Sequence, residues 1–374
     1  MHGCIAKIPW TLLLSAAALL VVGWLGIARA QELFGSKGYV ARQLCWSAVA
    51  LVGTVAAALP NSRHLCRFSY VAMAAALVAL TAVLLFPPIN GARSWIRIGP
   101  VGVQPSEFAK LAFVLCVARY LMYRRNYTRL AGLCIPLGLA LVPVLLILKE
   151  PDLGTALVFG PVLFAMLLVA GARLRDLALV AMLAAAALPA IWTQMNREQR
   201  SRITAMFEPC TPGVAPSDDA YHLYQSKRTF ALGGTRGSLF DERTDEHALL
   251  YTLPAAHTDF IFAVLAERFG WWGTAGVLLL YLMLVWSGLG IAAGTREPFG
   301  RLVAVGLTAL VAVQVLVNAA MTVGLAPITG LSLPLVSYGG SGLLVTGIGL
   351  GLLANIAMRP GYELGSEAFR DAAY

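Results

Sequence analysis

The stretch WTLLLSAAALLVVGWLGI, residues 10–27, contains no charged side chain and is long enough to cross a bilayer. A helix needs about 20 apolar residues to span a hydrocarbon core roughly 30 Å thick. Similar runs recur along the chain, of which 59% is hydrophobic and only 13% charged. Soluble domains carry about 25% charged residues. The sequence therefore predicts an all-α, polytopic integral membrane protein.

We expect about ten transmembrane helices, separated by polar or Pro- and Gly-containing breaks. They cover residues 10–27, 44–59, 70–86, 108–122, 130–148, 155–170, 177–192, 273–293, 302–323 and 343–358. An even number of spans leaves both termini on one side of the membrane. Lys7 and the segment Ala28-Arg29-Ala30 imitate a signal peptide, but the first apolar run is longer than a typical signal sequence. We expect an uncleaved first span, with cleavage as the minority alternative.

Basic residues in alternate loops predict the orientation, because cytoplasmic loops carry the excess of Lys and Arg. The richer set of loops contains Arg63, Arg67, Arg124, Arg125, Arg129, Arg173, Arg175, Arg296 and Arg301, and the other contains Arg29, Lys37, Arg42, Arg93, Arg97 and Lys149. Both termini are therefore predicted to be cytoplasmic. The net charge of +9 fits this pattern and anionic lipid, so no nucleic-acid binding is expected. Six scattered cysteines imply no disulfide framework.

Four polar segments fall on the predicted outer face. The longest, residues 194–256, is the most charged part of the chain, and the others cover residues 90–110, 149–156 and 324–342. A loop as long as the first is usually functional or disordered, and its aromatic residues argue against disorder. Segment 324–342 is uncharged and rich in Gly, Pro and Ser. Because irregular backbone survives at membrane depth only inside protein or along a cavity, it predicts a re-entrant outer loop.

The stretch LPAAHTDFIFAVLAE, residues 253–267, places a carboxylate against an apolar run. We expect Thr258 to cap a helix and Asp259 to lie in its first turn, where the helix dipole favours an anion. The alternative is a chemical role, because ionisable residues at membrane depth usually mark substrate paths or proton relays. His257 is a candidate for tuning Asp259 or holding a substrate hydroxyl.

Segment 90–110 brings three cations and an indole together: Arg93, Trp95, Arg97 and Lys110. Arginine forks fit phosphate oxygens, and Trp95 could stack on a sugar; the alternative is an interfacial anchor. We expect Gln104 to lie in a turn, Ser106 to cap the next helix and Glu107 to pair with Lys110, three residues further on. That pair leaves structural and functional roles equally open.

Two further segments carry polar candidates. Asp152 is expected either to cap the span that starts near residue 155 or to face the cavity with a basic partner. Gln225, Ser226, Lys227 and Arg228 offer donors and cations in the large loop, where a solvated charged face is the alternative.

Six motifs occur in the order and spacing seen in the RodA/FtsW/SpoVE family, the shape, elongation, division and sporulation (SEDS) proteins, which this chain resembles over nearly its whole length. They are NGARSWIRIG, QPSEFAKLA, EPDLGTAL, YQSK, HTDFIFAVLAE and PITGLSLPLVSYGGSG. The resemblance implies a single membrane domain over residues 1–374 of a bacterial cytoplasmic membrane. It also implies a peptidoglycan glycosyltransferase that polymerises lipid II at the outer face.

The resemblance identifies Asp259 with the family's essential aspartate. Lipid II carries its disaccharide in α linkage and the glycan is β-1,4, so one inverting displacement suffices, with Asp259 as general base. Arg93, Arg97 or Lys227 would stabilise the departing pyrophosphate, with a divalent cation, Mg²⁺ or Mn²⁺, expected beside it. The substrate-binding set is Arg93, Trp95, Arg97, Gln104, Ser106, Glu107, Lys110, Asp152, Gln225, Ser226, Lys227, His257, Thr258 and Ser337.

Three positions depart from the family pattern. Pro254 is followed by Ala255 and Ala256 where relatives commonly have a glutamate, Gly102 replaces a usual basic residue, and the glycine-rich segment after YQSK reads ALGGTRGSLF. These changes concern the acceptor site and the charge around the pyrophosphate, and they leave Asp259 in place.

Two other functions stay open beside the polymerase. A lipid II flippase would need polar residues in the cytoplasmic half-spans, whereas the polar motifs cluster outside, and a catalytically silent scaffold would not need Asp259. The expected partners are a class B penicillin-binding protein that cross-links the strands and other elongasome or divisome membrane proteins. Short predicted tails favour an elongation-type member over a division-type one.

Overall fold

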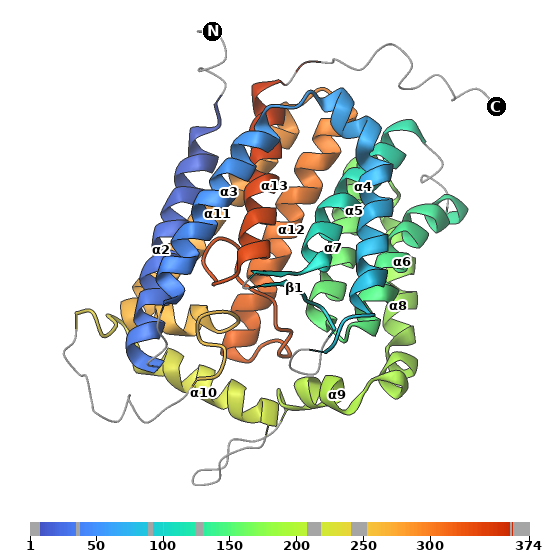
Figure 1. Ribbon diagram of the computed structural model, residues 1–374. Coiled ribbons are helices and arrows are strands. Elements are labelled where there is room, and N and C mark those ends of the chain that lie inside the picture. The colour runs from blue at the N-terminus through green and yellow to red at the C-terminus, as the bar shows by residue number, and fades with distance from the viewer. Residues whose placement is uncertain are drawn as a thin grey trace.

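The computed structural model describes residues 8–34, 38–88, 93–99, 101–124, 130–207, 218–240, 253–359 and 361. Long helices run side by side through the molecule, and two shorter helices lie across one end of the bundle (Figure 1). The long helices are α2 (Trp10–Phe34), α3 (Tyr39–Ala58), α4 (Ser62–Val83), α5 (Pro105–Tyr123), α6 (Cys134–Lys149), α7 (Leu153–Ala170), α8 (Leu174–Gln194), α11 (Ile261–Gly294), α12 (Pro298–Val323) and α13 (Gly340–Met358). The all-α polytopic fold predicted from the sequence is confirmed.

A 3-10 turn, two short helices and a β-hairpin join the long helices in the described chain. A 3-10 turn, η2 (Leu130–Leu133), precedes α6, and α9 (Arg197–Thr204) and α10 (Asp218–Leu232) lie within the large predicted loop. The strands β1 (Ile96–Ile98) and β2 (Val101–Val103) form an antiparallel hairpin in which Arg97 faces Gly102. The sequence did not predict this hairpin, since three-residue strands carry too little periodicity to detect.

Nine of the described helices are long enough and apolar enough to cross a membrane, judged by length and composition. The tenth expected span corresponds to α5, which contains Glu107, Lys110 and Arg119. Helix α5 packs against α4, α7 and α12 and buries most of its side chains. Glu107 and Lys110 are buried inside the protein, where they compensate each other, and the half-buried Arg119 donates to the carbonyl oxygens of Cys66 and Arg67.

Small residues set how closely the central helices approach. A Cβ at Gly351 of α13 would lie 2.2 Å from the carbonyl oxygen of Thr54, and one at Gly347 would lie 2.8 Å from that of Ala50. Helices in membranes gain contact by such close backbone approach. By contrast, α8 is poorly covered by the rest of the described chain, and Met182 and Leu188 are each 61% exposed.

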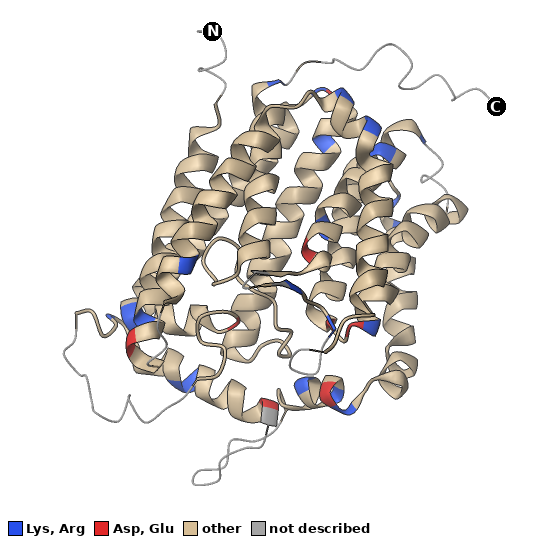
Figure 2. Cartoon of the chain, viewed as in Figure 1, with Lys and Arg blue, Asp and Glu red and all other residues tan. Residues whose placement is uncertain are grey.

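Helix α2 begins and α13 ends at the same end of the bundle, as an even number of spans requires (Figure 1). Lys and Arg residues lie at both ends of the bundle, whereas most Asp and Glu residues lie toward the end that carries α9 and α10 (Figure 2). The side of the membrane on which the termini lie stays a prediction from the loops. We refer to the end that carries α9 and α10 as the outer end.

Several helices begin earlier than the hydropathy pattern predicts, because polar residues extend them beyond the apolar core. Helix α3 begins at Tyr39 rather than at residue 44, and α4 begins at Ser62, where Asn61 accepts a hydrogen bond from the backbone N–H of Arg63. The span predicted from residue 273 is the second part of α11. Gly270, with φ 67° and ψ −166°, breaks α11 and separates residues 261–269 from it.

The segment between α12 and α13 folds back into the protein, as predicted for a re-entrant loop. Its apolar side chains Ile328, Leu331, Leu333, Leu335 and Val336 are buried. Gly154 at the start of α7 lies so close that a Cβ there would be 2.3 Å from the carbonyl oxygen of Thr329. The loop is therefore packed inside protein, the condition under which irregular backbone is stable at membrane depth.

Candidate functional site

Asp259 lies in a chain of turns before α11, and not in the first turn of the helix. The carbonyl oxygen of Ala255 accepts hydrogen bonds from the backbone N–H groups of Thr258 and Asp259, both at 3.1 Å, and of Phe260 at 3.3 Å. Helix α11 begins only at Ile261. The predicted N-cap at Thr258 is therefore wrong, because its hydroxyl donates to the same Ala255 oxygen instead of accepting a helical N–H.

Neighbouring elements hold this turn through its backbone. Asn318 of α12 donates its amide to the carbonyl oxygens of Asp259 at 2.8 Å and Leu331 at 2.7 Å. Ser337 donates to the carbonyl oxygen of Thr258 at 2.6 Å, and the N–H of Tyr338 donates to that of His257 at 2.8 Å. Because these hydrogen bonds engage the main chain, they leave the Asp259 carboxylate available to accept a proton or to bind a ligand.

The surroundings of Asp259 favour a base that is active near neutral pH. Burial raises the pKa of Asp259 to about 6; the hydrogen bond with Thr258 and the positive charge of Arg202 lower it, and the negative charge of Asp152 raises it. A Cβ at Gly330 would lie 3.7 Å from Asp259 Oδ2 and 4.0 Å from Arg202 Nη1. Gly330 (φ 72°) thus lies between the carboxylate and a guanidinium from α9.

A second carboxylate is fixed close by at the start of α7. Asp152 Oδ1 accepts the N–H of Thr155 at 3.0 Å, which confirms the predicted N-cap, and Oδ2 accepts the amide of Gln104 at 3.1 Å. Burial raises the pKa of Asp152, the bonds to Thr155 and the charge of Lys110 lower it, and Glu107 raises it. The site thus joins the ends of α5, α7 and α11.

Glu107 and Lys110 form the predicted pair on one face of α5, with 2.7 Å between Lys110 Nζ and Glu107 Oε1. Glu107 also reaches the loop before α13, since a Cβ at Gly342 would lie 3.6 Å from Glu107 Oε2 and 3.7 Å from Ser332 Oγ. A cavity of about 10 Å³ adjoins Glu107, Ser332 and Ser337, enough for about one water molecule. The pair therefore adjoins the outer site.

Ser106 does not cap α5 as predicted. Pro105 occupies the first helical position, which its fixed φ favours, so the helix begins two residues earlier than predicted, with Gln104 as N-cap. Ser106 is fully buried, and its hydroxyl has no hydrogen-bond partner within the described ranges.

The outer hairpin places its cations at the surface. Arg93 and Arg97 are exposed, and Arg93 donates to the carbonyl oxygen of Leu84 at 3.2 Å. The ring of Trp95 covers Gly102, since a Cβ there would lie 3.2 Å from Trp95 Cε3. The indole thus occupies the space that a side chain at position 102 would need.

Helix α10 docks onto the outer ends of α11 and α12. Ser226 donates to the carbonyl oxygen of Thr322 at 2.9 Å, and a Cβ at Gly324 would lie 2.5 Å from Lys227 Nζ. Lys227 therefore lies at the C-terminal end of α12, where the helix dipole favours a cation. Gln225 is buried, and its side-chain oxygen Oε1 has no hydrogen-bond partner among the residues described.

His257 packs between aromatic rings. Its centroid lies 4.1 Å from that of Tyr39 and 5.8 Å from that of Tyr338. Burial lowers the pKa of His257, so the neutral imidazole is favoured. The pKa of Asp259 is set by burial, Thr258, Arg202 and Asp152 rather than by His257. The hypothesis that His257 tunes this carboxylate therefore gains no support.

Three residues that contact the site were not among the sequence candidates: Arg202, Asn318 and Gly330. Arg202 is one of many charges in the large loop, and its separation in sequence hides its approach to Asp259. Asn318 carried a usable signal, since a fully buried amide in an apolar span must find partners. Gly330 was one glycine among several in its loop.

Together these elements define an all-α polytopic membrane protein with a carboxylate-centred site at one end of its bundle. The family model of the cell cycle proteins FtsW, RodA and SpoVE matches residues 6–361. The chain belongs to this family.

Individual relatives agree with this assignment. The peptidoglycan glycosyltransferase MrdB of Escherichia coli K12 is 39% identical over 282 residues, which cover 75% of each chain. The RodA rod shape determining protein of Thermus thermophilus is 30% identical, with a TM-score of 0.69 over 93% of this chain and 96% of its own. A chain solved in a study of polymerization and crosslinking by a peptidoglycan synthase complex is 32% identical, with a TM-score of 0.78 over 93% and 97%.

Proposed function

We propose that this protein is a peptidoglycan glycosyltransferase that polymerises lipid II into β-1,4 glycan strands. The observation that carries the proposal is the placement of Asp259. Its backbone is fixed by Asn318, its carboxylate adjoins Arg202, and its pKa is raised to about 6. A general base works best with a pKa near the operating pH. The membership of the family and the name of the MrdB relative support the same reaction.

The proposed reaction is a single displacement with inversion. Asp259 accepts the proton of the acceptor sugar's 4-hydroxyl while that oxygen forms a bond to the anomeric carbon of the donor. The bond between this carbon and the pyrophosphate oxygen breaks, and the pyrophosphate leaves with the bonding electrons. Base catalysis contributes about 10²–10⁴-fold, and charge stabilisation and alignment of the two lipid-linked substrates supply the remainder.

Arg202 is the cation best placed to act beside Asp259. Its guanidinium adjoins Gly330 and affects the pKa of the carboxylate, and it also pairs with Glu198 at 3.0 Å. Arginine matches phosphate oxygens in a bidentate geometry. The exposed Arg93 and Arg97 are proposed to meet the substrate further out, whereas Lys227 is engaged at the end of α12.

A divalent cation remains a proposal that the donor groups support only in part. Within the described ranges, no three His, Cys, Asp or Glu side chains are grouped so that they could hold a metal ion. Mg²⁺ at phosphate sites takes one or two carboxylates together with substrate phosphates and water. The cation would therefore be recruited mainly by the substrate, and the residues' roles above do not depend on it.

The competing flippase function would need a polar route toward the other end of the bundle. The cavity that adjoins Glu107 and Lys110 on their inner side has about 20 Å³ and is lined mainly by apolar side chains, among them Leu307, Leu310, Leu350 and Leu353. This lining favours the polymerase over transport.

The proposed setting is the bacterial cytoplasmic membrane, with both termini in the cytoplasm and the site outside. The proposed partner is a class B penicillin-binding protein that cross-links the strands, together with other elongasome or divisome proteins. The similar chain solved in the study of polymerization and crosslinking by a peptidoglycan synthase complex supports such a pairing. An elongation role is proposed ahead of a division role.

The test is incubation of labelled lipid II with the purified protein and its cognate penicillin-binding protein, with transpeptidation blocked. Parallel vesicles that contain the protein alone are assayed for lipid II movement between leaflets. Long glycan strands without movement between leaflets support the polymerase. Movement without any glycan would replace it with the transport function.

A further inference from the structure

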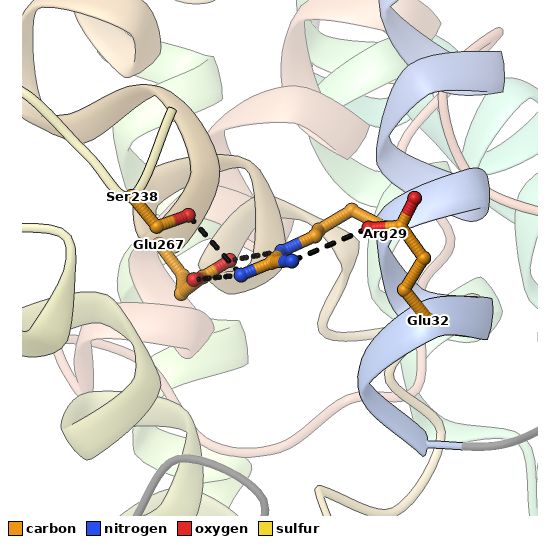
Figure 3. A network of polar contacts seen from close by, with 4 residues as sticks. All are labelled: Arg29, Glu32, Ser238 and Glu267. Atoms are coloured by element: carbon orange, nitrogen blue, oxygen red, sulfur yellow. Dashed lines mark hydrogen bonds and ion pairs between the residues drawn. The ribbon is translucent and has the colours of Figure 1, made fainter. Parts of the chain in front are cut away.

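Arg29 of α2 and Glu267 of α11 form an ion pair near the outer end of the bundle (Figure 3). Arg29 Nη2 lies 2.7 Å from Glu267 Oε1, and Arg29 Nε lies 3.0 Å from Oε2, so the guanidinium grips both carboxylate oxygens. The two side chains are only 12% and 7% exposed. A bidentate pair adds geometric specificity as well as energy. It therefore fixes how residues 261–269 are rotated against α2.

The same guanidinium reaches the segment that follows α10. Arg29 Nη2 donates to Ser238 Oγ at 3.2 Å, and the N–H of Ser238 donates to the carbonyl oxygen of Glu267 at 2.8 Å. Gly237 and the break at Gly270 are so close that a Cβ at Gly237 would lie 2.4 Å from the nitrogen of Gly270. The pair thus lies where α2, the broken part of α11 and the end of the large loop meet.

Helix α2 also contacts the two structures that place Asp259. A Cβ at Gly26 would lie 2.8 Å from Leu265 Cδ2, so α2 packs directly on residues 261–269. A Cβ at Gly23 would lie 2.8 Å from the Cα of Val336, in the loop that bonds the backbone of Thr258. Asp259 is only two residues before α11, so a rotation of residues 261–269 would carry its carboxylate with it.

We infer that Arg29 and Glu267 are positioning residues for Asp259, which they hold in its working orientation by locking residues 261–269 against α2. The inference rests on the proposed function. A buried ion pair is weak evidence for stability, because desolvation offsets much of the attraction. A bidentate grip at this position is better explained by the geometry it imposes. Lysine would keep the charge but lose the fork, so it separates the two roles.

The experiment compares wild type with Arg29→Lys, with the charge exchange Arg29→Glu/Glu267→Arg, and with Ser287→Ala. Ser287 is the matched control, because its hydroxyl lies 3.1 Å from that of Thr11 and joins the same two helices at the other end. Glycan polymerisation gives kcat and KM, and thermal unfolding reports stability. A misplacement of about 1 Å can cost about 10²-fold in rate, so we expect a loss of that order in kcat for Arg29→Lys, with little change in KM or unfolding temperature. The exchange is expected to recover most of kcat.

An Arg29→Lys variant with wild-type kcat would overturn the inference, as would a loss of kcat equal to that of Ser287→Ala. If Arg29→Lys does not fold, the charge exchange decides, since a folded exchange variant must regain kcat. If wild type itself makes no glycan, the proposed function fails. The positioning of Asp259 by Arg29 and Glu267 is then tested by measuring how fast a carbodiimide labels Asp259, with mass spectrometry as the readout. A labelling rate that Arg29→Lys changes and Ser287→Ala leaves alone would support positioning, and equal rates in all three proteins would refute it.

Discussion

Arg202 and Asp259 both approach Gly330, although they lie far apart in the sequence. Their side-chain atoms would lie 4.0 Å and 3.7 Å from a Cβ at Gly330. Arg202 belongs to α9 in the large loop and Asp259 precedes α11, so the approach joins two parts of the chain that sequence alone treats separately. The guanidinium lowers the pKa that burial raises, and the balance is a pKa of about 6.

The rate of glycan synthesis is expected to rise with pH through a pKa near 6. Asp259 accepts a proton only when ionised, so kcat/KM should be low at acidic pH, half-maximal near the pKa of about 6 and level above it. The measurement is kcat/KM for lipid II against pH. A profile that is flat from about pH 5 to about pH 8 would contradict a base of this pKa.

Removing the two neighbouring charges should move that profile in opposite directions. Arg202→Gln removes a cation that lowers the pKa of Asp259, so the rise in rate should shift to higher pH. Asp152→Asn removes an anion that raises it, so the rise should shift to lower pH. Asparagine can still cap α7, which limits structural damage. Shifts of the same sign in both variants would contradict the electrostatic assignment.

Gly330→Ala is expected to impair catalysis beyond its cost in stability. Gly330 has φ 72°, where a side chain costs roughly 1–2 kcal/mol, and its new methyl would also lie in van der Waals contact with the Asp259 carboxylate, in space that a substrate hydroxyl would need. Gly171→Ala is the matched control, since Gly171 has φ 105° and no described atom within 4 Å of its Cβ position. Both variants should unfold at lower temperature, and only Gly330→Ala should lose kcat. Equal kcat in the two variants would show that the site tolerates the methyl.

Glu150→Gln is expected to stabilise the protein, and more so at high pH. Glu150 is fully buried, and neither carboxylate oxygen has a partner among the described residues. Burial, and then the charge of Asp152, raises the pKa of Glu150 from 4.5 to about 8. A carboxyl whose pKa rises on folding makes the protein less stable as pH rises between these values, because the unfolded state has released its proton while the folded state still holds it.

Glutamine is as unpaired as a protonated Glu150 but never carries a charge, so a gain in stability is expected for Glu150→Gln above about pH 8 and little gain near about pH 4.5. Thermal unfolding in detergent across this range measures it. A difference between the two proteins that does not change with pH would mean that folding leaves the pKa of Glu150 unchanged, and would contradict the expected shift.

The fold was largely predictable because membrane-spanning helices can be recognised in a sequence as long apolar runs. The exceptions have local causes. Helix α5 carries three charged residues, and hydropathy alone underrates it, although Glu107 and Lys110 are buried between neighbouring helices. The break at Gly270 depends on contact with Gly237 of a distant segment, which no local pattern encodes.

The site was predictable in its residue types and less so in its geometry. The placement of Asp152 and the pairing of Glu107 with Lys110 followed from helix rules and are confirmed. The N-caps predicted at Ser106 and Thr258 are wrong, because Pro105 and the turn at Ala255 determine where those helices begin. The contribution of Arg202 arises from tertiary approach, and only the structure reveals it.

The most direct test of the account is glycan synthesis by Asp259→Asn, compared with wild type at equal amounts of folded protein. Asparagine matches the shape of aspartate and keeps the backbone bonds from Asn318 and Ser337, but it cannot accept the proton. The account predicts a loss of at least about 10²-fold in kcat, the lower range for general base catalysis. Strand synthesis by Asp259→Asn at the wild-type rate would contradict it.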